Sequence, residues 1–291
     1  MYSKKRNKIC LIFAILVAWT ALITWIIWGN GALTVEEIVI TSKRIPTPFT
    51  GFRMVQVSDL HNCSFGEDNQ TLLDMIQKAK PDIIVLTGDF VDSRHTYLAV
   101  ALAFAKQSVK IAPTYYVTGN HEARITEWQT FAAKLKISGV KILENETVQL
   151  KRDNAVITLA GVHDPMFQED ALPGASQVGT QAEMAETISD LHLSPNTYTV
   201  LLSHRPELFD VYVANNVDLV LTGHAHGGQI RLPFIGGLVA PGQGLFPKYD
   251  AGLFEKDDTQ MIVSRGLGNS IFPLRINNRP HLVVITLASE T

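Results

Sequence analysis

A long apolar stretch near the N-terminus is the first feature of the hydrophobic pattern. Residues 9–28 carry no charged side chain and follow a cluster of Lys and Arg residues in positions 4–8. About 20 residues in a helix measure roughly 30 Å, which matches the hydrocarbon thickness of a bilayer. The pattern predicts a basic cytoplasmic stub over 1–8 and a transmembrane anchor over 9–28, with the rest outside the cytoplasm. A cleavable signal peptide and a buried core helix are the alternatives.

Beyond the apolar stretch, short β-rich runs alternate with amphipathic helical spacing. The runs that end in polar residues, often with a glycine, are 54–57, 82–86, 114–117, 198–202 and 218–221. Helical spacing occurs at 72–80, 97–109, 128–137 and 183–191. This alternation predicts stacked α and β layers in one domain over 29–291. Ligands usually bind in such folds at the carboxyl ends of the strands.

Composition agrees with a folded protein and argues against a nucleic-acid binder and a disulfide-rich scaffold. The chain has 291 residues, of which 46% are hydrophobic, and a net charge of −3. It therefore lacks the basic excess of a protein that binds nucleic acid, so no nucleic-acid partner is expected. Its two cysteines, Cys10 and Cys63, are too few for a disulfide framework.

Side chains that can bind metal follow each of the five β-rich runs. They are Asp59 and His61, then Asp89, then Asn120, then His204, and finally His224 and His226. In extended backbone, residues i and i+2 face the same way, so both i, i+2 pairs are expected to present two ligands. Oxygen and imidazole ligands without thiolate favour Mn, Fe or Zn.

Seven ligands are more than one tetrahedral ion can bind. The sequence therefore predicts two divalent ions bridged by Asp89. Such a centre is positively charged and attracts a phosphate, so the expected reaction is phosphoester hydrolysis. The same residues could instead be strand-end groups that only form hydrogen bonds within loops.

The five motifs D-L-H, G-D, G-N-H-E, S-H and G-H-A-H, in this order, resemble those of the calcineurin-like metallophosphoesterase superfamily. The resemblance spans 59–226 and implies an α/β fold, a four-layer αββα sandwich of two mixed sheets. It implies a first ion held by Asp59, His61, Asp89 and His226, and a second held by Asp89, Asn120, His204 and His224. It also implies that His121 faces the phosphate as a general acid and binds no metal.

A looser resemblance to the membrane-anchored bacterial branch of the superfamily covers the C-terminal region. It rests on 264–270, after a strand-like run at 261–263, and on the Gly/Pro-rich segment 232–247. The resemblance implies an extracytoplasmic phosphoesterase, and some relatives act on lipid-linked or cell-envelope phosphates. Substrate-binding candidates are Arg265, Arg124 and His163, although surface salt bridges or packing would also explain these side chains.

Two further alternatives stay open. The apolar residues in 232–235 and 244–247 favour core packing, but they could instead form an apolar lip that guides a lipid-bearing phosphate. The second candidate function is a catalytically silent binding module with the same fold. Such a module would be expected to lose Asn120, His121 or Asp89, and all three are present.

Overall fold

Two mixed six-stranded sheets form the centre of the protein. The computed structural model describes residues 2–167, 177–269 and 272–290. The first sheet has the order β1 (Thr34–Ser42), β16 (His281–Ser289), β2 (Arg53–Val57), β3 (Ile83–Thr87), β4 (Thr114–Val117) and β5 (Lys141–Ile142). The second has the order β14 (Gly252–Lys256), β15 (Thr259–Val263), β9 (Leu219–Thr222), β8 (Thr199–Leu202), β7 (Ala155–Gly161) and β6 (Glu146–Arg152).

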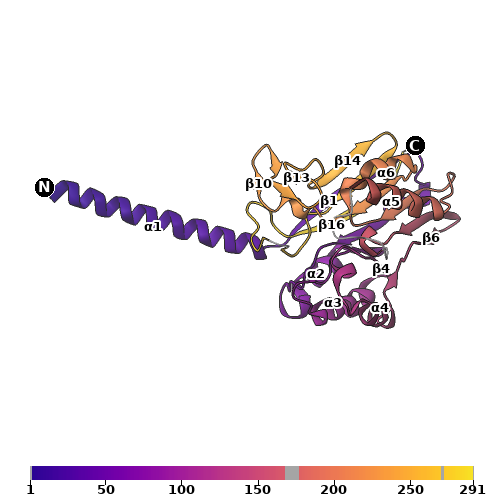
Figure 1. Cartoon of the computed structure of the whole chain (residues 1–291), viewed down its shortest axis with the longest axis horizontal. Coiled ribbons are helices and arrows are strands. Elements are labelled where there is room, and N and C mark those ends of the chain that lie inside the picture. Colours follow the sequence, from indigo (N-terminus) through magenta and orange to yellow (C-terminus); the bar gives the residue numbers. More distant parts are fainter. Residues whose placement is uncertain (1, 168–176, 270–271, 291) are drawn as a thin grey trace.

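Helices cover the outer face of each sheet (Figure 1). Those over the first sheet are α2 (Gln70–Ala79), α3 (Leu98–Ile111) and α4 (Trp128–Ile137), and those over the second are α5 (Gln177–Asp190) and α6 (Phe209–Ala214). Between the sheets, side chains such as Met54 and Val85 of the first pack with Val200 and Leu221 of the second. This arrangement confirms the predicted αββα sandwich.

Parallel pairing brings the predicted ligand-bearing loops to one edge. Strands β2, β3 and β4 are parallel, and so are β7, β8 and β9. Their carboxyl ends therefore point the same way within each sheet. All five β-rich runs predicted from the sequence form strands, with bounds that differ by no more than about one residue.

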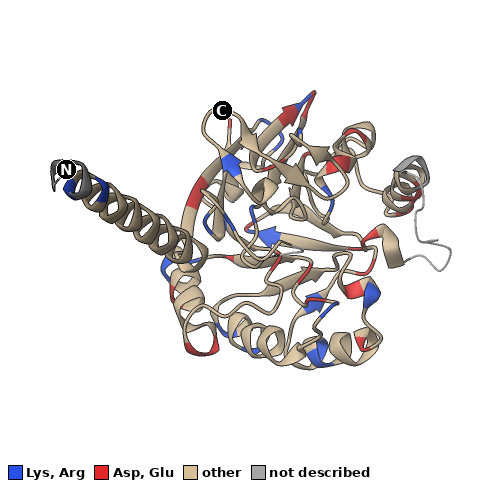
Figure 2. Ribbon diagram, turned by 60° about the vertical axis from the view of Figure 1, so that its left-hand side comes forward, with Lys and Arg blue, Asp and Glu red and all other residues tan. Residues whose placement is uncertain are grey.

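The N-terminal helix α1 (Tyr2–Gly31) projects away from the sandwich (Figure 1). Its segment Arg6–Gly31 has a mean hydropathy of 2.5 and is long and apolar enough to cross a membrane. Lys and Arg residues lie at its N-terminal end, and the rest of the helix carries no Lys, Arg, Asp or Glu (Figure 2). The predicted apolar helix is thus present, and it ends slightly later than residue 28.

Short elements complete the connections. The two-residue strands are β10 (Arg231–Leu232), β11 (Gly236–Gly237), β12 (Val239–Ala240) and β13 (Gly244–Leu245). The 3-10 segments are η1 (Thr47–Phe49), η2 (Glu67–Asn69), η3 (Glu122–Arg124), η4 (Pro165–Phe167), η5 (Pro206–Leu208) and η6 (His226–Gly228).

The expectation of core packing for the apolar residues between β10 and β13 is wrong for their largest side chains. Phe234 is 109% exposed, Ile235 63%, Leu245 69% and Phe246 59%. The two hairpins are only two residues long on each side, so they form no layer that could cover these groups. Phe234 and Phe246 also take positive φ angles at turns. We call these four side chains the apolar tips.

Candidate metal centre

The predicted ligands converge at the edge shared by the two sheets. Asp59, His61, Asp89 and His226 form one group, and Asp89, His204 and His224 form another. Within each group the candidate ligand atoms all lie within 4.8 Å of one another, and every residue is buried. Asp89 belongs to both groups. The remaining predicted ligand, Asn120, is 5% exposed, and its side-chain oxygen has no hydrogen-bond partner in the part of the chain that the structure describes.

The ring nitrogens of these groups approach one another in pairs. Nε2 of His61 lies 3.2 Å from Nε2 of His226, and Nδ1 of His224 lies 3.2 Å from Nε2 of His204. Burial lowers the pKa of His61 to about 3 and holds the pKa values of His224 and His226 well below their usual range. When the facing nitrogens are unprotonated, they direct lone pairs at a common point, which fits a bound cation.

The Asp89 carboxylate also favours a positive charge at its contact with His204. Their Oδ2 and Nε2 atoms lie 3.2 Å apart, and Oδ2 of Asp89 is also 3.5 Å from Nε2 of His61. Burial lowers the pKa of His204, but the Asp89 carboxylate outweighs burial and raises it to about 10. His204 Nδ1 donates to the Thr87 carbonyl at 2.8 Å, which leaves Nε2 to face the carboxylate. The oxygen and nitrogen donors therefore fit divalent ions.

Unusual backbone conformations direct the ligands inward. Asp59, His61, Asp89, His224 and His226 all have φ between 44° and 63°. The expectation that extended backbone presents the i, i+2 pairs is therefore wrong. Left-handed conformations cost about 1–2 kcal/mol for such residues and are concentrated at functional sites. The strain is held in place by the surrounding loops.

Glu122 links the loops after β3 and β4. Its carboxylate accepts hydrogen bonds from the backbone N–H groups of Asp89 (2.9 Å), Phe90 (2.8 Å), Val91 (3.3 Å) and Gly119 (2.7 Å). Burial and the nearby Asp89 raise the pKa of Glu122, whereas the four donors favour its ionised form. This contact sets the position of Asp89 relative to the loop that carries the next predicted ligand.

His121 lies beside the ligand groups, with its ring centroid 4.5 Å from that of His61. Its Nδ1 accepts a hydrogen bond from the Ser93 backbone N–H at 3.0 Å and lies 3.7 Å from Oδ1 of Asp92. Burial lowers the pKa of His121, which favours the neutral ring. Because Nδ1 accepts, the proton of the neutral ring is on Nε2.

The three substrate-binding candidates lie outside the two ligand groups. Arg265 donates to Oγ1 of Thr34 at 3.2 Å, close to the end of α1. Arg124 is exposed and its guanidinium lies 3.4 Å from Sδ of Met166. His163 contacts Oγ1 of Thr118 at 3.0 Å and stacks on Phe167. Their role in substrate binding stays a prediction.

Sequence reasoning missed a charged network around the centre. Arg205 forms two hydrogen bonds with Asp164, at 2.7 and 2.9 Å, and Glu207 lies 3.8 Å from Nε2 of His224. Arg205 directly follows the predicted ligand His204, and this position in the sequence could have identified it as part of the site. Arg275 is 2% exposed, and its guanidinium lies 3.5 Å from Nδ1 of His226. No motif in the sequence marks Arg275.

The fold and the site define a class of hydrolases that hold metal between two mixed sheets. The calcineurin-like phosphoesterase family model matches residues 52–228, and the chain belongs to this family. The protein is accordingly a metal-dependent phosphoester hydrolase. The family assignment agrees with the resemblance of the five motifs.

Relatives with curated names cover most of the chain. Uncharacterized metallophosphoesterase YkuE from Bacillus subtilis (strain 168) is 32% identical over 87% of this chain and 85% of its own length. Phosphodiesterase YaeI from Escherichia coli (strain K12) is 29% identical, over 81% of this chain and 82% of its own. A bovine (Bos taurus) transmembrane protein with metallophosphoesterase domain is 27% identical over 97% of this chain, which spans 64% of that protein.

Proposed function

We propose that this protein is a membrane-anchored phosphoesterase that uses two divalent ions, of Mn, Fe or Zn, to cleave a phosphate mono- or diester. The observation that carries the proposal is that Asp89 belongs to both groups of buried ligand atoms. One carboxylate between two cation sites is the arrangement that two-metal hydrolysis requires. The first ion would be held by Asp59, His61, Asp89 and His226, and the second by Asp89, Asn120, His204 and His224.

His121 stabilises the negative charge that develops on the leaving oxygen in this proposal. When bound, divalent ions supply an activated water molecule and neutralise charge on the phosphate. The hydrogen bond from Ser93 to Nδ1 leaves the proton of the neutral His121 ring on Nε2. This N–H can therefore donate a hydrogen bond to the leaving oxygen and stabilise its developing negative charge, and one such donor contributes roughly 10²-fold or more to a rate.

The proposal includes helix α1 as an anchor that keeps this reaction at the outer face of the cytoplasmic membrane. The basic residues before its apolar segment favour an N-terminus in the cytoplasm, so that the domain after the span lies outside. We assign 1–8 to the stub, 9–28 to the anchor and 29–291 to the catalytic domain. The exposed apolar tips support a lipid-linked or cell-envelope phosphate as substrate, because they give the domain a surface that can contact a bilayer.

The proposal is tested on the full-length protein by metal analysis and by turnover of aryl phosphate mono- and diesters with added Mn²⁺. We expect two ions per chain in the wild type and in His121→Ala, which should lose about 10²-fold in kcat. Asp89→Ala should bind less metal, since it removes the ligand common to both groups. His95→Ala, which changes an exposed histidine, is the control.

Fewer than two ions per wild-type chain under saturating Mn²⁺ would contradict the dinuclear assignment. Full activity of His121→Ala would show that the reaction does not depend on the His121 side chain. Hydrolysis of only one ester type would decide between a monoesterase and a diesterase.

A further inference from the structure

A pocket of about 270 Å³ lies where α1 ends against the catalytic domain. Its volume corresponds to roughly nine water molecules, which is enough for a phosphate group and part of its substituent. We call it the arginine pocket. Its principal lining residues are Trp25, Trp28, Arg265, Arg275, Asn277 and Arg279.

The walls of the arginine pocket are held together by hydrogen bonds. Asn30 donates to the Arg275 carbonyl at 2.9 Å and accepts from the Arg275 N–H at 2.8 Å. Arg279 donates to the carbonyls of Ala32 and Leu33 at 2.9 and 2.8 Å, and its guanidinium lies 4.7 Å from the Trp28 ring. The end of α1 and the segment before β16 therefore form one preorganised unit.

The described lining of the pocket carries positive charge, while Glu36 and Asp250 act on Arg265 from outside this lining. Three arginines line it, and no acidic side chain is among its lining residues. Nε of Arg265 is buried and has no hydrogen-bond partner among the described residues, while its Nη2 donates to Thr34. An unpaired guanidinium donor in such a place favours an anion with several acceptor oxygens, and the fork of arginine matches phosphate.

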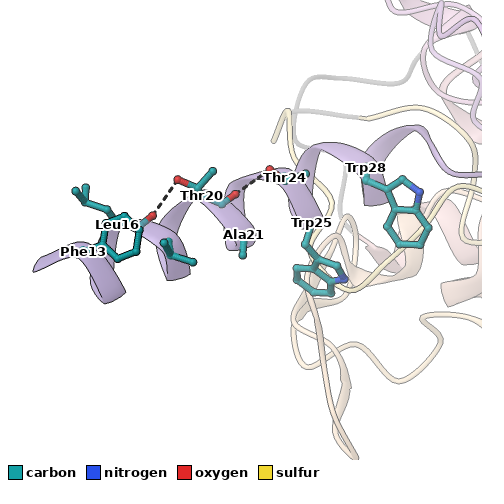
Figure 3. A pocket seen from close by; sticks show the side chains of 8 residues that line it. Phe13, Leu16, Thr20, Ala21, Thr24, Trp25 and Trp28 are labelled. Carbon is teal, nitrogen blue, oxygen red and sulfur yellow. Dashed lines mark hydrogen bonds between the residues drawn. The ribbon is translucent and has the colours of Figure 1, made fainter. Parts of the chain in front are cut away.

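A shallow, open apolar groove on one face of α1, within the membrane-spanning segment, ends at the arginine pocket. The groove runs along one face of α1 and is lined by Phe13, Leu16, Val17, Thr20, Ala21 and Thr24 (Figure 3). Trp25 and Trp28 line both the groove and the arginine pocket. A ligand with a long apolar chain and a phosphate head would match this continuous surface.

The apolar tips lie at the same end of the domain as the arginine pocket. The N–H of Arg231 in β10 donates to the Ile276 carbonyl at 3.0 Å, and Asn277 donates to the Arg231 carbonyl at 3.3 Å. The hairpins with the tips are thereby attached to the segment that contacts α1 (Figure 1). With α1 in a bilayer, tips and pocket would both face the leaflet from which α1 emerges.

We propose that the arginine pocket binds the phosphate of an anionic phospholipid whose acyl chain lies along the α1 groove. The proposal rests on the membrane attachment given under the proposed function. Arg265 and Arg279 contact the lipid phosphate, and the two tryptophans lie at the level of the headgroups. Arg275 separates this lipid from His226, so the lipid is a docking ligand beside the metal centre and differs from the substrate.

Native mass spectrometry of the full-length protein in non-ionic detergent tests the proposal. The probes are dioleoylphosphatidylglycerol, dioleoylphosphatidylcholine and free glycerol phosphate. We expect the wild type to retain one phosphatidylglycerol in preference to phosphatidylcholine and to bind glycerol phosphate much more weakly. Arg265→Gln and Arg279→Gln should each weaken retention about tenfold or more, since each removes a charged hydrogen-bond donor. Arg152→Gln in β6 is the matched control and should retain the lipid.

Absence of a phosphatidylglycerol preference in the wild type would overturn the proposal without reference to any variant. Lipid retention at the wild-type level by both Arg265→Gln and Arg279→Gln would also overturn it. Binding of glycerol phosphate as tightly as the lipid would exclude a lipid occupant. Alkaline extraction of membranes separates this proposal from the previous one. Release of the wild-type chain would contradict the membrane anchor, whereas a retained chain without bound lipid would contradict only the lipid site.

Discussion

Replacing Glu122 by glutamine should destabilise the protein far more than the loss of one charge suggests. Oε1 accepts from Phe90 and Val91, and Oε2 accepts from Asp89 and Gly119. Glutamine has one oxygen, so in either amide orientation its NH₂ group faces two backbone N–H donors. Each buried donor left without a partner costs about 1–3 kcal/mol.

The loss of two such partners predicts a decrease of about 2–6 kcal/mol in the free energy of unfolding. A domain of this kind is typically stable by about 5–15 kcal/mol, so the variant should remain foldable but weak. Alanine would orphan all four donors and is expected to prevent folding. Glutamine is therefore the informative substitution.

Urea unfolding of the full-length protein in detergent measures this effect, with buried Trp128 as the fluorescent reporter. Glu144→Gln is the matched control, because Glu144 forms a surface pair with Lys136 at 2.8 Å. Such pairs contribute about 0–1 kcal/mol. If Glu122→Gln unfolded within about 1 kcal/mol of the wild type, the proposed linking role of Glu122 would be refuted.

Two other substitutions give further predictions. In Gly223→Ala the added Cβ would lie 2.3 Å from Oδ2 of Asp59, so metal affinity should fall by roughly 10-fold or more, whereas Gly31→Ala meets no atom within 4 Å and should bind metal normally. The hydrogen bond from His281 lowers the pKa of Glu36, which therefore stabilises the fold above the usual glutamate pKa. The urea midpoint of the wild type should exceed that of Glu36→Gln at neutral pH, and the difference should shrink as the pH falls below about 4.3. A constant difference across this range would contradict the assigned ionisation.

The sequence alone determined the elements whose signal is local. An unbroken apolar run identified the N-terminal helix, and short β-rich runs bounded by polar residues identified the five strands. The run at 114–117, for example, coincides with β4 (Thr114–Val117). The motifs also named the ligand groups, since glycine and ligand residues follow each strand directly. The α/β layers followed from the same alternation.

Only the tertiary structure decided how these parts meet. His61 and His226 are 165 positions apart, and their 3.2 Å approach depends on the packing of two sheets. The left-handed backbone of Asp59 and Asp89 likewise persists only because surrounding contacts oppose local preference. Long-range contacts also directed Arg265 to the end of α1 and left Phe234 exposed. Sequence patterns describe residues that are neighbours along the chain. The burial of a side chain and its hydrogen-bond partners depend on segments that approach one another only in the folded state.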